Sequence, residues 1–191
     1  MLQLQERLNL IDAQEKSRDS FMEYIRFIWP NFIEGDHHRV VADKLTAVAK
    51  GDIKRLIVNM PPRHTKSEFA SVYFPSWIMG LKPDMKIMQT THTADLSVRF
   101  GRKVRNLMDS DEYASIFPSV TLSADSKSAG RWETSQGGEY FAAGVGGAIT
   151  GRGADLLIID DPHSEQDALS PNLLESAYEW YTSGPRQRLQ P

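Results

Sequence analysis

Three short apolar runs, separated by segments with helical spacing, constrain the fold of this chain more than any other feature. The runs are RLIVNM at 55–60, KIMQTT at 86–91 and DLLIID at 155–160. Each is too short for a typical helix and has the continuous apolar character of a strand buried on both faces. Strands that alternate with helices are typical of a parallel sheet covered by helices. We therefore expect an α/β fold with a mainly parallel β-sheet.

The intervening segments carry apolar residues three or four positions apart. Gly51 is a natural C-cap, Ser170 followed by Pro171 is a typical helix start, and Pro75 predicts a kink or an end in its segment. Alternating apolar residues on both sides of Gly137 and Gly138 predict a β-hairpin. We expect one or two helices over 2–28, and further helices over 37–51, 67–80, 93–111 and 170–184.

Composition limits the possible classes of protein. The 191 residues include no cysteine, which fits a reducing compartment and excludes Cys-based zinc sites. No apolar run approaches the ~20 residues of a membrane span, and no signal peptide is visible, so a soluble cytoplasmic protein is expected. His37 and His38 lack a spaced third ligand, which argues against a metal site.

The net charge of −3 gives no overall electrostatic reason to bind nucleic acid. The densest basic cluster lies on the segment 93–111. It has two readings: contact with phosphates of DNA or a partner, or a charged helix face in solvent. The cluster comprises Arg99, Arg102, Lys103 and Arg105.

The loop NMPPRHTKSE follows the first apolar run and ends in Lys66-Ser67, at the start of an expected helix. Phosphate-binding loops use backbone N–H groups, a helix N-terminus and a lysine in this context. The usual glycines are replaced by Met60 and Thr65. Because a β-branched residue resists positive φ, we expect the loop to avoid that region at Thr65. The alternative is an ordinary turn with Lys66 in solvent.

A second polar group follows the last apolar run. Asp160 and Asp161 stand where a parallel strand ends, and open α/β sheets bind their ligands at this edge. In a phosphate-loop enzyme the first acid holds Mg²⁺, and the adjacent acid orients and deprotonates the attacking water. Solvated turn residues before Pro162 are the alternative. The Lys-Ser loop and the acid pair together favour nucleotide hydrolysis.

Three long segments carry a family resemblance that covers roughly residues 20–190. MPPRHTKSE resembles the Walker A variant of bacteriophage terminase large subunits. IMQTTHTADLSVRFGRKVRNLMDSDEYASIFP is similar to the segment that follows it in these packaging ATPases, and RWETSQGGEYFAAGVGGAITGRGADLLIIDDPH is similar to the stretch through their Walker B motif. The resemblance implies a P-loop NTPase (RecA-like) domain, the N-terminal ATPase part of a motor that drives double-stranded DNA into a procapsid. It also implies the portal protein, the small terminase subunit and a ring of identical subunits as partners.

The resemblance assigns roles to individual residues. Lys66 would neutralise the β- and γ-phosphates of ATP, while Ser67 and Asp160 would bind Mg²⁺. Asp161 would be the catalytic base, with Glu165 as a rival. Arg152 is the candidate for an arginine supplied in trans to a neighbouring subunit, with a solvated hairpin arginine as the alternative. The nucleotide would contact the loop residues Pro62, Arg63, His64, Thr65, Lys66 and Ser67.

Arg63 matches the family's γ-phosphate arginine; otherwise it is a loop arginine in water. By the same resemblance, residues 1–35 form an N-terminal helical segment with an adenine-side region, and 36–191 form the ATPase core. Family members continue into a coupling motif and a nuclease domain, so we expect a core that is incomplete at its C-terminus and leave full turnover open. Alternatives are a catalytically weak interaction module that docks on the portal or small subunit, or a helicase-like ATPase.

Overall fold

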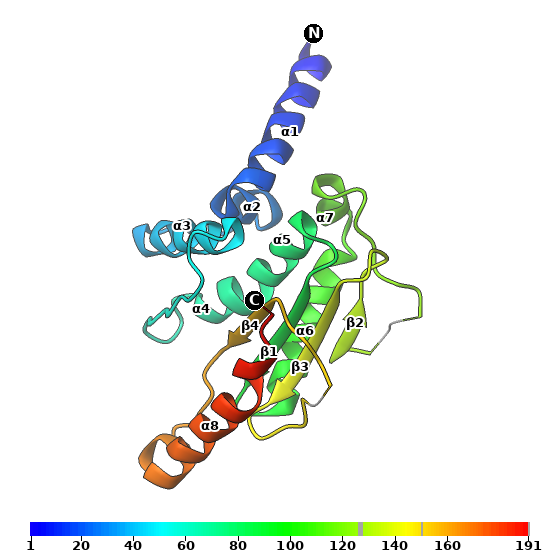
Figure 1. Cartoon of the computed structure of the whole chain (residues 1–191). Coiled ribbons are helices and arrows are strands. Elements are labelled where there is room, and N and C mark those ends of the chain that lie inside the picture. The colour runs from blue at the N-terminus through cyan, green and yellow to red at the C-terminus, as the bar shows by residue number, and fades with distance from the viewer. Residues whose placement is uncertain (126–127, 150, 191) are drawn as a thin grey trace.

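The computed structural model describes residues 1–125, 128–149 and 151–190, and the chain forms an α/β fold around a four-stranded sheet (Figure 1). The strand order is β2-β3-β1-β4. β1 pairs in parallel with β3 and β4, and β2 pairs antiparallel with β3. The predicted mainly parallel sheet is therefore confirmed. The strands are β1 (Lys86–Thr91), β2 (Arg131–Glu133), β3 (Glu139–Gly144) and β4 (Leu156–Ile159).

Most helices agree with the predicted segments, and residues 2–28 divide into two of them, but α7 (Asp111–Ile116) was not predicted. Thr93 caps α6 because its hydroxyl accepts a hydrogen bond from the Leu96 N–H at 3.3 Å. Gly51 ends α3 with a φ of 86°. The α-helices are α1 (Leu2–Asp19), α2 (Phe21–Ile28), α3 (Asp36–Lys50), α4 (Lys66–Glu68), α5 (Phe74–Leu81), α6 (Ala94–Met108), α7 (Asp111–Ile116) and α8 (Pro171–Ser183). Short 3₁₀ turns are η2 (Asp167–Leu169) and η3 (Pro185–Arg188).

Pro75 marks an irregularity in a helical segment that continues to Leu81. The turn before it, η1 (Phe69–Tyr73), is π-helical. Proline has no N–H to bond the carbonyl four residues earlier, which here belongs to Ser71. The helix widens into a π turn where this hydrogen bond is missing. Such π turns are frequent at functional sites.

The predicted hairpin is confirmed. The Thr134 N–H donates to the Gly138 carbonyl at 2.9 Å, and Gly137 has a φ of 88°. Trp132 and Tyr140 stack with ring centroids 4.9 Å apart, and both are fully buried. This aromatic pair fixes the pairing of β2 with β3.

The strand predicted at 55–60 is wrong. Those residues form no regular element, and none of them pairs with a strand in the described part of the chain. Leu56 packs against the core, whereas Ile57 is 85% exposed. An apolar run becomes a strand only with a ladder partner. Among the described strands, β4 is an edge strand that pairs with β1 alone.

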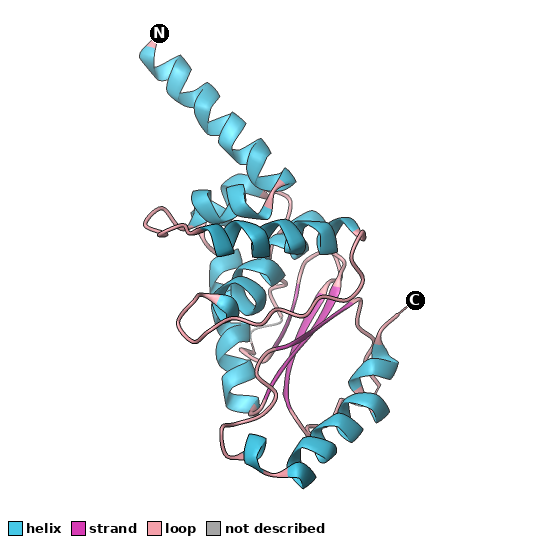
Figure 2. Ribbon diagram, turned by 90° about the vertical axis from the view of Figure 1, so that its left-hand side faces the viewer, coloured by secondary structure: helices cyan, strands magenta, loops and turns pink. Residues whose placement is uncertain are grey.

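Helices cover both faces of the sheet (Figure 2). The larger core lies against α2, α5 and α6, and a smaller one lies between the sheet and α8. Phe21 and Ile25 of α2 are fully buried in the larger core together with Trp77. The N-terminal segment 1–35 therefore shares its core with the segment predicted as the ATPase core.

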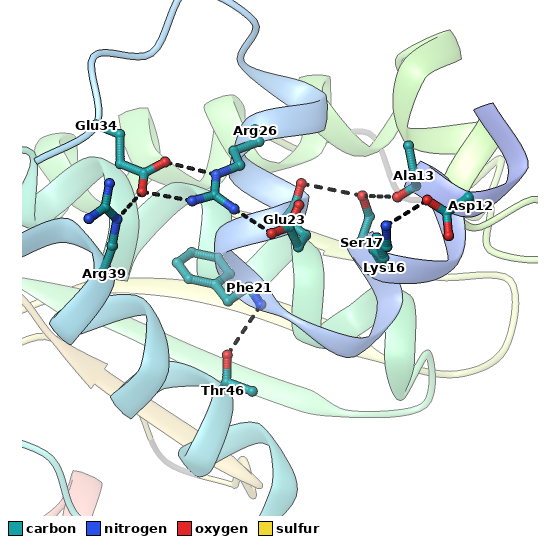
Figure 3. Close-up of polar contacts among 10 residues, drawn as sticks. All are labelled: Asp12, Ala13, Lys16, Ser17, Phe21, Glu23, Arg26, Glu34, Arg39 and Thr46. Atoms are coloured by element: carbon teal, nitrogen blue, oxygen red, sulfur yellow. Dashed lines mark hydrogen bonds and ion pairs between the residues drawn. The ribbon is translucent and has the colours of Figure 1, made fainter. Parts of the chain in front are cut away.

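The first helix projects from this body (Figure 1). Polar contacts join its end to α2 and join α2 to α3; the Phe21 N–H, for example, donates to Thr46 Oγ1 at 3.2 Å (Figure 3). None of the described helices has both the length and the apolar character needed to cross a membrane.

Candidate functional site

Lys66 brings the two predicted motifs together. It is the first residue of α4, and its Nζ lies 3.3 Å from Oδ1 of Asp160, which follows β4. The same Nζ donates to Oδ1 of Asp161 in a second ion pair. Burial opposes the charge on Lys66, but the contacts with Asp161 and Asp160 outweigh it and raise the pKa of the ammonium group. The structure therefore excludes the alternative of an isolated lysine in solvent.

The two acids differ in their surroundings. The Asp160 side chain is only 5% exposed, and its Oδ2 accepts a hydrogen bond of 2.9 Å from the Ser71 hydroxyl. The Asp161 side chain is 65% exposed and has a φ of 44°. Its carbonyl accepts from the His92 N–H at 3.2 Å, which ties this left-handed residue to the end of β1. A buried acid suits cation binding, and an exposed one suits contact with water.

The expectation that Thr65 avoids positive φ is wrong. Thr65 has a φ of 69°, and Arg63 has a φ of 65°. This conformation costs a non-glycine residue about 1–2 kcal/mol. His38 compensates at Thr65, because its Nε2 lies 3.0 Å from Thr65 Oγ1. A tertiary hydrogen bond therefore holds the threonine at the position where the common phosphate-loop pattern has glycine.

The tautomer of His38 follows from its two partners. The Gly35 N–H donates to Nδ1 at 2.9 Å, so Nδ1 is unprotonated and Nε2–H donates to Thr65. Burial, followed by the nearby His37, lowers the pKa of His38, while Glu34 opposes the shift. Protonation at Nδ1 would break the bond from Gly35. The neutral imidazole is therefore the form that supports the loop.

Glu34 anchors the segment that carries His38. Arg26 donates two hydrogen bonds to its carboxylate, both of 2.8 Å, and Arg39 donates a third (Figure 3). Arg26, and after it Arg39, lower the pKa of Glu34 to about 2. This cluster links α2 to the start of α3 and so fixes His38 beneath the loop.

We expect the folded state to lose stability as the pH falls below about 6.5, the ordinary pKa of histidine. Because the pKa of His38 is lowered in the fold, the unfolded chain binds a proton first, and stability rises with pH across that window. In His38→Gln, urea unfolding measured between about pH 5 and pH 8 should show a shallower pH dependence than in the wild type. The exposed His64→Gln serves as the control. An unchanged slope in His38→Gln would contradict the assignment.

The remaining loop residues are placed as follows. Ser67 is the second residue of α4, directly after Lys66, and is half-buried. Pro62, Arg63 and His64 are exposed, and His64 Nδ1 lies 2.9 Å from the Pro62 carbonyl oxygen. In the described part of the chain, the Arg63 guanidinium has no hydrogen bond or ion pair. Glu165 is also exposed.

Arg152 lies away from this site in its own chain. Its Nη1 donates to Glu139 at 2.6 Å, and its guanidinium carbon lies 4.2 Å from the centre of the Phe141 ring. Glu139 begins β3, opposite Lys86 at the start of β1, whereas Asp160 follows the end of β4. The alternative of a solvated hairpin arginine is therefore wrong, because the Arg152 guanidinium is paired with Glu139 and stacked on Phe141. A role in trans stays a prediction.

A cavity of about 230 Å³ is lined by Pro162 and His163, which follow Asp161 in the chain. Its lining includes His92 and His163, whose Nδ1 and Nε2 atoms, respectively, are buried without a hydrogen-bond partner in the structure as described. Trp180 of α8 also lines it. This cavity therefore offers buried hydrogen-bonding groups to water or to a bound molecule.

The side chains near Lys66 offer few ligands for a metal ion. Within the described ranges, no group of three or more His, Cys, Asp or Glu side chains could hold one. Mg²⁺ needs fewer protein ligands, because it is commonly bound by one or two carboxylates together with substrate phosphates and water. The buried Asp160 carboxylate beside Lys66 fits such a site, and Ser67, the residue after Lys66, carries a hydroxyl that could join it.

Two contacts in this site involve residues that the sequence patterns did not single out: Ser71 and Gln89. The Gln89 Nε2 donates to Ser71 Oγ at 3.1 Å, beneath Asp160. The only available signals were a polar residue inside an apolar strand and a serine four positions after Ser67.

No protein-family model matches the chain, and no curated protein matches it closely enough to count as a relative.

Proposed function

We propose that this chain binds Mg-ATP and hydrolyses it at the carboxyl edge of its parallel sheet. The observation that supports this most is the convergence of Lys66, Asp160 and Asp161 from two elements that are 94 or more positions apart in the sequence. A lysine at a helix start beside two acids at a strand end has the charges required for phosphoryl transfer. The loop before Lys66 supplies backbone N–H groups for the phosphates.

In the proposed reaction, water attacks the γ-phosphorus and the bond to the β–γ bridging oxygen breaks, which gives ADP and phosphate. Lys66 exchanges its carboxylate partners for the β- and γ-phosphate oxygens. This exchange frees the exposed Asp161 to orient the water and accept its proton. Ser67 and Asp160 would hold Mg²⁺, which when bound neutralises phosphate charge. Arg63 is free to reach the γ-phosphate.

The biological setting rests on the resemblance alone. We infer a terminase large subunit whose P-loop (RecA-like) ATPase segment works in the host cytoplasm, at the portal of a procapsid. Its partners would be double-stranded DNA, the portal protein, the small terminase subunit and further copies in a ring. In such a ring Arg152 would act on a neighbouring subunit, once it is released from Glu139.

The first experiment measures binding and turnover in wild type and in Asp161→Asn. Mg-ATP at about 100 times its dissociation constant should stabilise the wild type by about 2.7 kcal/mol. Asp161→Asn should bind ATP at least as tightly, because one competitor for Lys66 has lost its charge. Its rate of phosphate release should fall about 10²–10⁴-fold, since the general base is removed. Calorimetry and a phosphate-release assay measure these quantities.

Glu165→Gln is the matched control and should keep the wild-type rate. A loss of rate in Glu165→Gln with full rate in Asp161→Asn would transfer the role of base to Glu165. Normal turnover in both variants would contradict a carboxylate base at either position.

A second candidate is a non-catalytic interaction module. It is favoured by the irregular segment 55–60, which pairs with no described strand although it leads into the loop. This module would show no thermal shift at millimolar Mg-ATP, whereas the ATPase would.

A further inference from the structure

Gln89 makes a directed chain of hydrogen bonds to the metal-binding acid of the proposed site. Its Nε2 donates to Ser71 Oγ at 3.1 Å, and Ser71 Oγ donates to Asp160 Oδ2 at 2.9 Å. The Ser71 hydroxyl has one proton, and it uses that proton in the hydrogen bond to the Asp160 carboxylate. Ser71 Oγ must therefore accept from Gln89. This requirement also fixes which end of the Gln89 amide faces Ser71.

The fold holds both ends of this chain of bonds rigidly. β1 is hydrogen-bonded to β3 on one side and to β4 on the other, and Gln89 pairs with Ala142 and Ile158. Asp160 follows two residues after Ile158, and its N–H donates to the Thr90 carbonyl at 2.9 Å. Ser71 comes from the π turn η1, which Pro75 follows. Asp160 is thus held by its backbone and by one carboxylate oxygen.

Stability does not explain the choice of glutamine. Gln89 is fully buried in the central strand, and its Oε1 is buried without a hydrogen-bond partner in the described structure. An unpaired buried polar atom is costly, so an apolar side chain of similar length would suit the core better. Polar groups kept at such a cost are expected at functional sites.

We propose that Gln89 is a positioning residue that acts through Ser71 to orient the Asp160 carboxylate. The bond from Ser71 occupies Oδ2 and leaves Oδ1 facing Lys66, where Mg-ATP would bind. This inference rests on the proposed function, because it assigns Asp160 to Mg²⁺. Partners that orient a metal ligand in this way typically change metal affinity 10–100-fold when they are removed.

The test is Gln89→Met, which keeps the length of the side chain and removes both polar atoms. The melting temperature without ligand should stay the same or rise, because the unpaired oxygen is gone. The Mg²⁺ concentration that half-saturates the enhancement of nucleotide binding should rise about 10-fold. Nucleotide affinity without Mg²⁺ should not change. Ser71→Ala should raise the Mg²⁺ requirement similarly, and the double variant should add little because the two residues act in series.

Ser76→Ala is the matched control on the next turns of the same helical segment. Ser76 is fully buried and its hydroxyl bonds the Tyr24 hydroxyl and the Tyr73 carbonyl, away from Asp160. It should lower the melting temperature and leave the Mg²⁺ requirement unchanged. If wild type binds Mg-ATP and Gln89→Met needs the same Mg²⁺ concentration as wild type, the positioning role of Gln89 is overturned while the proposed function stands. If wild type binds no Mg-ATP, the proposed function falls, and this inference falls with it.

Discussion

Replacing Lys66 with alanine is expected to weaken ATP binding about 100-fold or more. A hydrogen bond to a charged group contributes about 1.5–3 kcal/mol, and the ammonium group would serve two phosphates. Since each 1.4 kcal/mol corresponds to about tenfold in affinity, binding should fall outside the range of calorimetry at micromolar protein. Thermal stabilisation by Mg-ATP should disappear in the same variant.

Lys103→Ala is the matched control for Lys66→Ala. Lys103 is also a lysine in an ion pair, with Glu68 two residues after Lys66, but it lies on α6. Its removal should leave ATP affinity within about twofold, because exposed ion pairs contribute only about 0–1 kcal/mol. Equal affinity in Lys66→Ala and wild type would remove the basis of the proposed function.

Replacing Phe21 with alanine is expected to destabilise the fold by about 3–5 kcal/mol. Phe21 is fully buried, and its ring lies 5.5 Å from those of Phe69 and Trp77 and 5.8 Å from that of Phe74. The cavity would lie behind the helical segment that follows the Lys66 loop. Urea denaturation followed by circular dichroism measures the loss, which is a large share of the 5–15 kcal/mol typical of a domain.

Leu8→Ala provides the comparison within the N-terminal segment. Leu8 lies on the projecting α1 and is half exposed, so its loss should change stability by no more than about 0.5 kcal/mol. If Phe21→Ala were equally mild, α2 would not share the core, and the division of the chain after residue 35 would mark a real boundary.

Local patterns predicted most of the fold. Helices with clear caps, such as α6 after Thr93 and α3 before Gly51, were found where expected, because caps and periodicity act within a few residues. The strands β1 and β4 were also predicted from apolar character. The run at 55–60 has the same character but no partner among the described strands. Strand pairing depends on the whole chain and cannot be read from the run alone.

The site was predictable where motifs carry it and unpredictable where tertiary contacts do. Asp160 and Asp161 follow from the end of β4, a strand that the sequence predicts. Lys66 lies beside them as expected, although the strand predicted before its loop is absent from the described sheet. The positive φ of Thr65 depends on His38, which lies 27 positions earlier, and no local rule includes that bond. Gln89 reads as an interior strand residue, and its contact with Ser71 appears only when β1 packs against η1.

The left-handed backbone at Arg63 and Thr65 bears on how fast a nucleotide could associate. The His38 imidazole already holds the loop at Thr65, so the loop does not have to be ordered when a ligand arrives. The entropic cost of ordering the loop is then part of folding and not of binding. Encounter should then proceed near the rate set by diffusion and orientation, with no slow rearrangement that saturates as nucleotide concentration rises.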